Sequence, residues 1–375
     1  MALVRGESVR EARSRRPGSH SRTAKPGLGE PHEGPDASLL GGGPKEDRTP
    51  DLCIANAALS QLSYRPMAKS VASRELGRTG KPTMTYSVEF CEKQYNNRLL
   101  VPEHAQIFQR WSALGKAFRD EREADAGTFL HRAYGQGDRE RLDYFHCGVE
   151  GAPLLVFIHG GYWRSLDKHD FSWVAKPFLE AHIDVAVVNY GLCPEVQIDD
   201  IVRQMYKACT WLYRNADSLG FDRELLCVAG HSAGAHLAAM LLCAQWPSWG
   251  PDLPPDLVKA GILLSGLYDL EPLLYAPFVN GDLRLDNDAV KRLSPVHMKP
   301  QALSAVVTAV GALESAEFIR QNGLIEAHWQ DNFRRDVPMP GTNHFTVVDA
   351  LADATNPLTR AAIELCLRPY VDPHG

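Results

Sequence analysis

The run LLCVAGHSAGAHLAAMLL at residues 225–242 decides the fold class. Its apolar start favours a strand and its small-residue end favours a helix, and the motif Gly230-His231-Ser232-Ala233-Gly234 lies between them. A serine hydroxyl is unreactive unless a sharp turn projects it toward a base, and flanking glycines relieve the crowding in such a turn. The order of strand, turn and helix therefore predicts a nucleophile elbow with Ser232 at its tip. A merely structural turn is the alternative.

A second glycine motif lies upstream, where HGGYW at residues 159–163 follows the apolar run PLLVFI. Gly160 and Gly161 have no side chain to obstruct their backbone N–H groups. We expect these N–H groups, with that of Ala233, to form an oxyanion hole. Tyr162 and Trp163 are candidate substrate contacts, and packing within the loop is the alternative for both.

A general base should follow the nucleophile late in the chain, and His344 in PGTNHF at residues 340–345 is placed in this way. The alternative is that His344 is a structural loop residue whose ring nitrogens are hydrogen-bonded within the protein. Three other late histidines are less suitable because they lie before the last strand, within an expected helix or at the terminus. They are His297, His328 and His374.

The third catalytic group is a carboxylate that accepts a hydrogen bond from the base. Glu314 in VGALESAEF follows the apolar run AVVTAV and precedes His344. Glutamate can serve because the requirement is a buried acceptor rather than a particular chain length. Glu317 is the second candidate, although we expect it to face solvent or cap a helix. Asp269 in SGLYDL is a further carboxylate at a strand end, where a structural role in a turn is expected.

Apolar runs alternate with amphipathic segments over most of the chain after residue 100. This alternation predicts an α/β fold with a mostly parallel sheet covered by helices on both faces. Strands are expected at 142–146, 154–159, 185–190, 225–229, 260–265 and 305–310, and near Val337. Helices are expected at 101–121, 168–181, 198–218, 233–244, 316–333 and 357–367.

Composition narrows the classes of partner. A net charge of -6 in 375 residues provides no basic field for a phosphate backbone, so no nucleic acid is expected. No apolar run is long enough for a membrane span or a signal peptide, so we expect no membrane association and a cytoplasmic location. The partner should be a small-molecule substrate, and a homodimer stays open. The motifs imply no cofactor and no metal, and the eight cysteines should be free thiols.

The chain divides by composition near residue 84. Residues 1–84 are rich in Gly, Pro, Ser and Arg and show no periodicity, so they are expected to be a disordered tail. Met67 and Met84 are alternative start sites, and the basic beginning leaves a transit peptide or an anionic partner open. Residues 85–375 should form the α/β-hydrolase domain.

Taken in order, several segments resemble the kynurenine formamidase (arylformamidase) group of α/β hydrolases. They are YNNRLLVP, HGGYW, NYGLCPEVQIDDIVRQ, GHSAGAHLAA, LSGLYDLEPL, RLSPV, VGALESAEF and GTNHF. The resemblance implies a triad of Ser232, His344 and Glu314 and an oxyanion hole at Gly160, Gly161 and Ala233. Relatives commonly carry aspartate where this chain has Glu314.

The resemblance also implies a reaction, which is hydrolysis of N-formyl-kynurenine to kynurenine and formate through an acyl-serine. A carboxylesterase acting on short acyl or aryl esters is the nearest alternative, since the same triad hydrolyses both bonds. A non-catalytic binding protein of the same fold is a further alternative. Such a protein would normally have lost the serine, the histidine or the oxyanion glycines, and all are present here.

Overall fold

A computed structural model describes residues 86–301 and 304–369. The predictions made for residues 1–84, namely a disordered tail and an alternative start, lie outside the described residues. His374 and Cys53 also lie outside them.

The strands of the described chain form one sheet in the order β1-β2-β4-β3-β5-β6-β7-β8. β2 pairs antiparallel with β1 and β4, whereas every pairing from β4 through β8 is parallel. The mostly parallel sheet predicted from the sequence is therefore confirmed. The strands are β1 (Phe129–Ala133), β2 (Arg141–Phe145), β3 (Ala152–Ile158), β4 (Asp184–Val188), β5 (Phe221–His231), β6 (Ala260–Leu264), β7 (Ala305–Ala309) and β8 (Phe333–Asp336).

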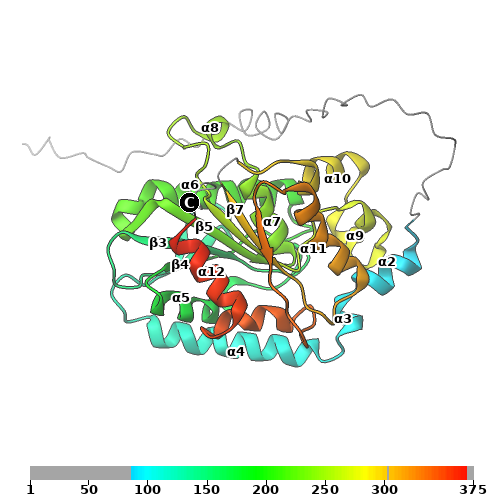
Figure 1. Cartoon of the computed structure of the whole chain (residues 1–375), viewed down its shortest axis with the longest axis horizontal. Helices are drawn as coiled ribbons and strands as arrows, with labels where there is room; N and C mark the ends of the chain where they lie inside the picture. Colours follow the sequence, from blue (N-terminus) through cyan, green and yellow to red (C-terminus); the bar gives the residue numbers. More distant parts are fainter. Residues whose placement is uncertain (1–85, 302–303, 370–375) are drawn as a thin grey trace, which may run out of the picture. The chain divides into compact units, whose positions relative to one another are not determined.

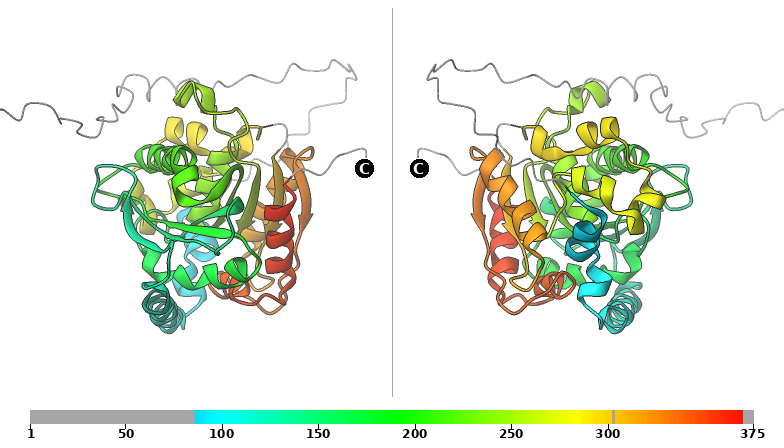
Figure 2. Two further views of the ribbon diagram at one scale, coloured as in Figure 1. Left: turned by 90° about the vertical axis from the view of Figure 1, so that its left-hand side faces the viewer. Right: turned by 90° about the vertical axis from the view of Figure 1, so that its right-hand side faces the viewer.

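Helices cover both faces of this sheet (Figures 1 and 2). The α-helices are α2 (Val88–Tyr95), α3 (Asn97–Leu100), α4 (His104–Arg122), α5 (Lys176–Glu180), α6 (Ile198–Leu219), α7 (Ala233–Leu242), α8 (Trp246–Trp249), α9 (Pro277–Leu283), α10 (Asn287–Leu293), α11 (Ala316–His328) and α12 (Pro357–Leu367). Short 3₁₀ turns are η1 (Lys168–Asp170), η2 (Ser172–Ala175), η3 (Glu271–Tyr275), η4 (Pro295–His297) and η5 (Thr346–Ala352).

Strand β3 shows how one sheet supports two cores. Leu154, Val156 and Ile158 belong to a core shared with α6, α7 and α11. Leu155 and Phe157 point to the opposite face and belong to a core shared with α4, α5 and α12. Successive side chains of a strand alternate between faces, so an uninterrupted apolar run such as LLVFI is required where both faces are covered.

Helix α4, predicted at residues 101–121, packs along η1 and η2. Its apolar residues Ile107, Trp111 and Phe118 are buried at helical spacing, whereas Leu114 is 41% exposed. Gly115 is the next residue on the buried side, and a Cβ added there would lie 1.9 Å from the His169 carbonyl oxygen. Glycine allows the helix to approach the chain this closely.

Two predicted helices differ from those observed. The segment 168–181 forms η1, η2 and only a short α5, because Asp167 caps the first turn in an extended conformation and Pro177 starts a separate helix. The helix expected at 316–333 ends at His328, and the neighbouring strand β8 begins at Phe333 rather than near Val337. Strand β1 and helices α2, α3, α8, α9 and α10 were not predicted.

Two further properties concern the described residues alone. Within them, no helix is both long enough and apolar enough to cross a bilayer. The seven cysteines that they include are all free, as predicted.

Candidate active site

Ser232 sits in the sharp turn between β5 and α7, with φ 57° and ψ −120°. Both flanking glycines are required for this geometry. A Cβ on Gly230 would lie 2.2 Å from the Gly234 carbonyl oxygen, and a Cβ on Gly234 would lie 2.0 Å from the Ile158 carbonyl oxygen. The turn is therefore the strained elbow that the sequence predicts, and it presents the serine hydroxyl at the carboxyl end of the central strands.

His344 approaches Ser232 from the loop that follows β8. Its Nε2 lies 3.0 Å from Ser232 Oγ, which is hydrogen-bond distance. The His344 side chain is only 3% exposed, and its ring packs 4.4 Å from that of Phe318. The two residues are far apart in the sequence and meet because parallel strands end at the same edge of the sheet.

Glu314 completes a chain of three side chains. It lies in the loop after β7, and its Oε2 is 2.7 Å from His344 Nδ1. The other oxygen, Oε1, accepts hydrogen bonds from Ser265 Oγ at 2.5 Å and from the Gly311 backbone N–H at 2.8 Å. The carboxylate is thus buried with acceptor sites on both oxygens occupied.

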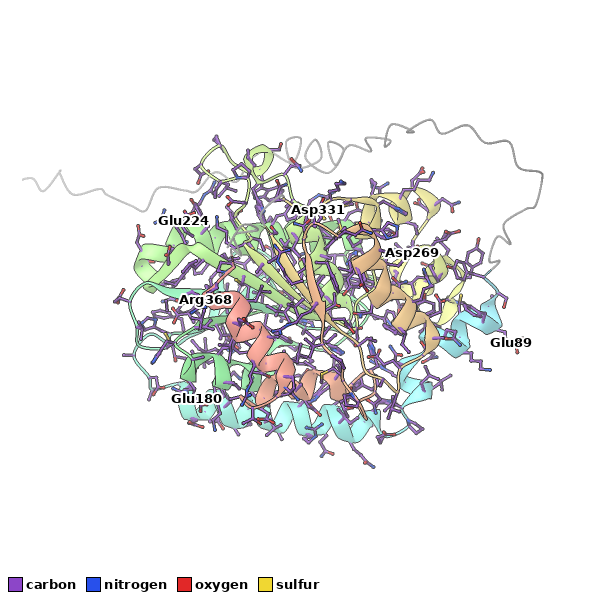
Figure 3. The ribbon with its side chains drawn as sticks, in the orientation of Figure 1. Glu89, Glu180, Glu224, Asp269, Asp331 and Arg368 are labelled. Carbon is purple, nitrogen blue, oxygen red and sulfur yellow. The ribbon has the colours of Figure 1, made fainter. Side chains whose placement is uncertain are left out.

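The competing residues lie elsewhere. Glu317 was expected to face solvent or cap a helix. Its side chain instead accepts a hydrogen bond from Tyr95 and pairs with Arg320, so it does not face solvent. Asp269, labelled in Figure 3, pairs with the same Arg320 of α11 at 3.3 Å. The side chains of His297 and His328 are exposed.

The loop HGGYW packs against the elbow. A Cβ on Gly160 would lie 3.1 Å from Ser232 Cβ, and Gly161 has φ +108° with Ser165 O only 2.1 Å from its added Cβ. Tyr190 donates its hydroxyl proton to the carbonyl oxygens of His159 and Gly160. Because a trans peptide points its N–H away from its C=O, the N–H groups of Gly160 and Gly161 point away from Tyr190.

Ala233 is the first residue of α7. The first N–H groups of an α-helix have no acceptor within the helix. The neighbouring Ser232 N–H is already used, since it donates to Leu264 O at 2.8 Å. Ala233 therefore supplies a backbone donor at the elbow, where the helix dipole also favours negative charge. The structure brings together all three residues predicted for the oxyanion hole.

A pocket opens onto the serine. Its lining includes Gly161, His231, Ser232 and His344, together with five aromatic side chains: Phe108, Trp111, Tyr162, Phe278 and Phe345. Polar residues and one leucine complete the lining: Asn96, Asn97, Arg98, Arg164, Ser165 and Leu166. Most of these wall residues were not predicted as site residues. Phe108 and Trp111 lie on the predicted helix α4, so its helical periodicity was the available signal.

Tyr162 and Trp163 were both predicted as candidate substrate contacts, and the structure separates them. Tyr162 lines the pocket while its hydroxyl donates to the Tyr95 carbonyl oxygen at 2.7 Å. Trp163 is fully buried away from the pocket lining, and its ring packs edge-on against His236 at 4.9 Å. Of the two alternatives for Trp163, the structure therefore favours packing within the loop over contact with substrate.

His231, the second residue of the elbow motif, was missed as a structural support. Its Nε2 donates to the His344 carbonyl oxygen at 2.7 Å, so its Nδ1 is the unprotonated ring nitrogen. Burial lowers the pKa of His231 to about 3, with nearby His344 as a second cause. A neutral imidazole thus connects the nucleophile turn to the backbone of the base.

Two groups of metal-ligating side chains occur among the described residues, and neither lines the pocket. One comprises His146, Cys147 and Asp184, and the other comprises His131, Asp143 and His169. In the second group the Lys168 ammonium lies 2.6 Å from Asp143 and 2.8 Å from His169, where a cation would sit. The expectation of no metal stays a prediction.

Comparison with known proteins gives the family. The profile of the BD-FAE family matches residues 146–246. The chain is 31% identical to kynurenine formamidase of Salmo salar over 250 residues, which are 64% of this chain and 82% of the relative. The chain belongs to the kynurenine formamidase family of α/β hydrolases. It is therefore a hydrolase, as predicted.

Further members and a solved structure agree with this assignment. The kynurenine formamidase of Danio rerio is 29% identical over 82% of its length, or 64% of this chain. A crystal structure described as a proposed thioesterase of Silicibacter is 33% identical with a TM-score of 0.62. The match covers 71% of this chain and 96% of that one. The two kynurenine formamidases are thus similar to this chain over 64% of its length.

Proposed function

We propose that this protein hydrolyses an aryl formamide, N-formyl-kynurenine, to kynurenine and formate through an acyl-serine intermediate. The observation that carries the proposal is the continuous contact Ser232–His344–Glu314 at the base of a pocket in a chain of the kynurenine formamidase family. The catalytic roles of the three residues follow from that geometry.

Ser232 is the nucleophile and His344 its general base. At 3.0 Å from Ser232 Oγ, His344 Nε2 takes the hydroxyl proton as the oxygen attacks the formyl carbon. Glu314, at 2.7 Å from Nδ1, holds the ring in the required tautomer and stabilises the imidazolium that forms. The carbonyl π electrons move to oxygen, which becomes the oxyanion.

Backbone N–H groups stabilise that oxyanion. We assign this role to Ala233 together with Gly160 and Gly161, which pack against the elbow. Preorganised donors of this kind stabilise the charge that develops in the transition state and require no reorganisation during the reaction.

Two steps complete the cycle. The imidazolium of His344 protonates the aryl amine as the C–N bond breaks, which releases kynurenine and leaves a formyl-serine. His344 then removes a proton from water, the water oxygen attacks the formyl carbon, and the proton returns to Ser232 Oγ as formate leaves. The aromatic walls, including Phe108 and Phe345, suit the aniline ring of such a substrate.

A carboxylesterase or thioesterase is the second candidate function. The same three groups cleave esters, and the Silicibacter structure that is 33% identical to this chain is described as a proposed thioesterase. The non-catalytic alternative has no support, since the serine, the histidine and the glycines are all in place. The cytoplasmic location, the small-molecule partner and the homodimer stay predictions.

Substrate preference distinguishes these functions. Purified full-length protein is assayed with N-formyl-kynurenine and with p-nitrophenyl acetate as the ester. We expect kcat/KM of about 10⁴ M⁻¹s⁻¹ or more for the formamide, the ordinary range for a native substrate. If only the ester is turned over, the esterase function replaces the formamidase.

A further inference from the structure

We propose that Arg98 binds a carboxylate of the substrate, which makes the pocket selective for substrates that carry this group. The proposal rests on the hydrolase function above and names its substrate class: aryl amides or esters that carry a carboxylate at a distance from the scissile bond.

The charge of the pocket points to an anion. Among the described residues that line it, Arg98 and Arg164 are the only members with a permanent charge, and no aspartate or glutamate is present. The whole chain has a net charge of -6, so a positive pocket is a local feature. A cleft lined by one sign of charge concentrates ligands of the opposite sign.

Only one of the two arginines is neutralised. Arg164 pairs with Asp282 at 2.6 Å. Within the described part of the chain Arg98 has no carboxylate partner, and its Nη2 donates instead to Ser165 Oγ at 3.1 Å. Burial, and after it the charge of Arg164, lowers the pKa of Arg98. An anion between these guanidinium groups would remove that unfavourable interaction.

Arg98 is also held in a defined position relative to the reacting atoms. Ser165 Oγ, which accepts from Arg98, donates to the Gly161 carbonyl oxygen at 3.0 Å. On its other side, the guanidinium lies over the Phe108 ring at 5.8 Å. These contacts connect the cation to the glycine loop beside Ser232, so a substrate held by both would be oriented.

The adjacent residue supplies a second donor. Asn97 is only 4% exposed and lines the same pocket. Its Nδ2 has no hydrogen-bond partner among the described residues. Buried amides are nearly always hydrogen-bonded, so an unpartnered donor beside Arg98 indicates a ligand group that accepts there. The arginine and the amide together suit a carboxylate.

The test compares matched substrates. One pair is N-formyl-kynurenine and N-(2-acetylphenyl)formamide, which share the aryl formamide but differ in the amino-acid group. The other pair is phenyl acetate with and without a carboxylate-bearing side chain. The full-length protein is assayed as wild type, Arg98→Met and Arg98→Lys, and Arg335→Met is the control because Arg335 pairs with Glu364 on the surface.

For each pair we compare kcat/KM of the carboxylated substrate with kcat/KM of the neutral one. We expect Arg98→Met to lower this ratio by about tenfold or more, because the variant loses a charge-assisted hydrogen bond to the carboxylate. The change should appear as a higher KM for the carboxylated substrate. Arg98→Lys should recover part of the ratio, and Arg335→Met should keep it. Equal loss for both members of a pair, or no loss, overturns the carboxylate site even if the formamide is hydrolysed. If the formamides are not hydrolysed and Arg98→Met lowers the ratio for the ester pair, the carboxylate site is supported and the formamidase function is contradicted.

Discussion

Glu314 and His344 approach each other from loops that follow two neighbouring parallel strands, β7 and β8, and their side chains meet at 2.7 Å. Ser265, at the end of β6, fixes the other oxygen of Glu314 at 2.5 Å. Three adjacent strand ends therefore position one carboxylate. The acid of this triad is held against the base by the sheet itself, and the chain length of glutamate fits the separation between the loops.

The first prediction concerns this carboxylate. Glu314→Gln should lower kcat for N-formyl-kynurenine by about 10³- to 10⁴-fold with little change in KM, because an amide does not stabilise the imidazolium or hold its tautomer. Glu314→Asp should lower kcat by about tenfold, since the shorter side chain cannot contact Ser265 and His344 together. Steady-state kinetics on the purified variants measures both.

Glu317→Gln is the matched control for this series. Glu317 is a buried glutamate of nearby helix α11, but it contacts Tyr95 and Arg320 instead of His344. Its kcat should stay within about threefold of wild type. A larger loss in Glu317→Gln than in Glu314→Gln would show that the acid is misassigned.

The second prediction concerns the glycine loop. Gly161→Ala should lower kcat by at least about 10²-fold, because its φ of +108° and the 2.1 Å approach of Ser165 O leave no room for a methyl group, and the loop must shift. Gly151→Ala has a similar φ of +73° with open space around it, so it controls for backbone strain alone. Equal activity of the two variants would exclude the oxyanion role.

The third prediction concerns acid stability. Burial lowers the pKa of His159 and of His236 to about 4, and that of His231 to about 3. The unfolded chain binds protons below pH of about 6.5 while these folded residues stay neutral, so their stabilisation is present above that pH and is lost as the pH falls toward about 4. The free energy of unfolding should drop by about 1.4 kcal/mol per pH unit for each of the three.

Urea unfolding between pH 7 and pH 5 measures this slope. His236→Asn removes one of the three histidines at a site outside the pocket lining, where Nε2 donates to the Leu293 carbonyl oxygen. That variant should be less stable than wild type at pH 7. Its free energy of unfolding should, however, change less steeply with pH than that of wild type. A slope that is unchanged in His236→Asn would contradict the assignment.

The fourth prediction concerns the buried ion pair of Lys168 and Asp143, which lie 2.6 Å apart with almost no exposure. Lys168→Met should lower the free energy of unfolding by about 3–5 kcal/mol, because it leaves an unpaired buried carboxylate. Adding Asp143→Asn removes that charge and keeps an acceptor for the His131 backbone N–H, so part of the loss should return. Chemical denaturation of the single and double variants checks this, and additive losses would contradict it.

Much of the fold could be predicted because the decisive signals are local. The elbow around Ser232 needs glycines at fixed positions, and helix α12 was predicted at residues 357–367, where it is observed. The apolar run before His159 predicted a strand buried on both faces. Glu314 and His344 could be proposed because they follow strands that end beside the elbow.

The remaining features depend on contacts between distant residues. Strand β1 has only five residues, FLHRA, and none of them is fully buried, so its pairing with β2 leaves no alternation of apolar and polar residues in the sequence. For Trp163, substrate contact and packing within the loop both stayed open, because sequence order does not reveal which side of a loop a ring occupies. The cluster of Lys168 with His131, Asp143 and His169 joins side chains from β1, β2 and η1. No regular spacing of these residues in the sequence predicts it.

Hydrolysis of N-formyl-kynurenine by full-length wild type and by Ser232→Ala tests whether Ser232 is the nucleophile. The variant keeps the elbow backbone and removes only the nucleophile. We predict that wild type cleaves the formamide to kynurenine and formate, and that kcat of the variant falls by about 10⁴-fold or more. Hydrolysis by Ser232→Ala at a rate close to that of wild type would contradict an acyl-serine mechanism at this residue.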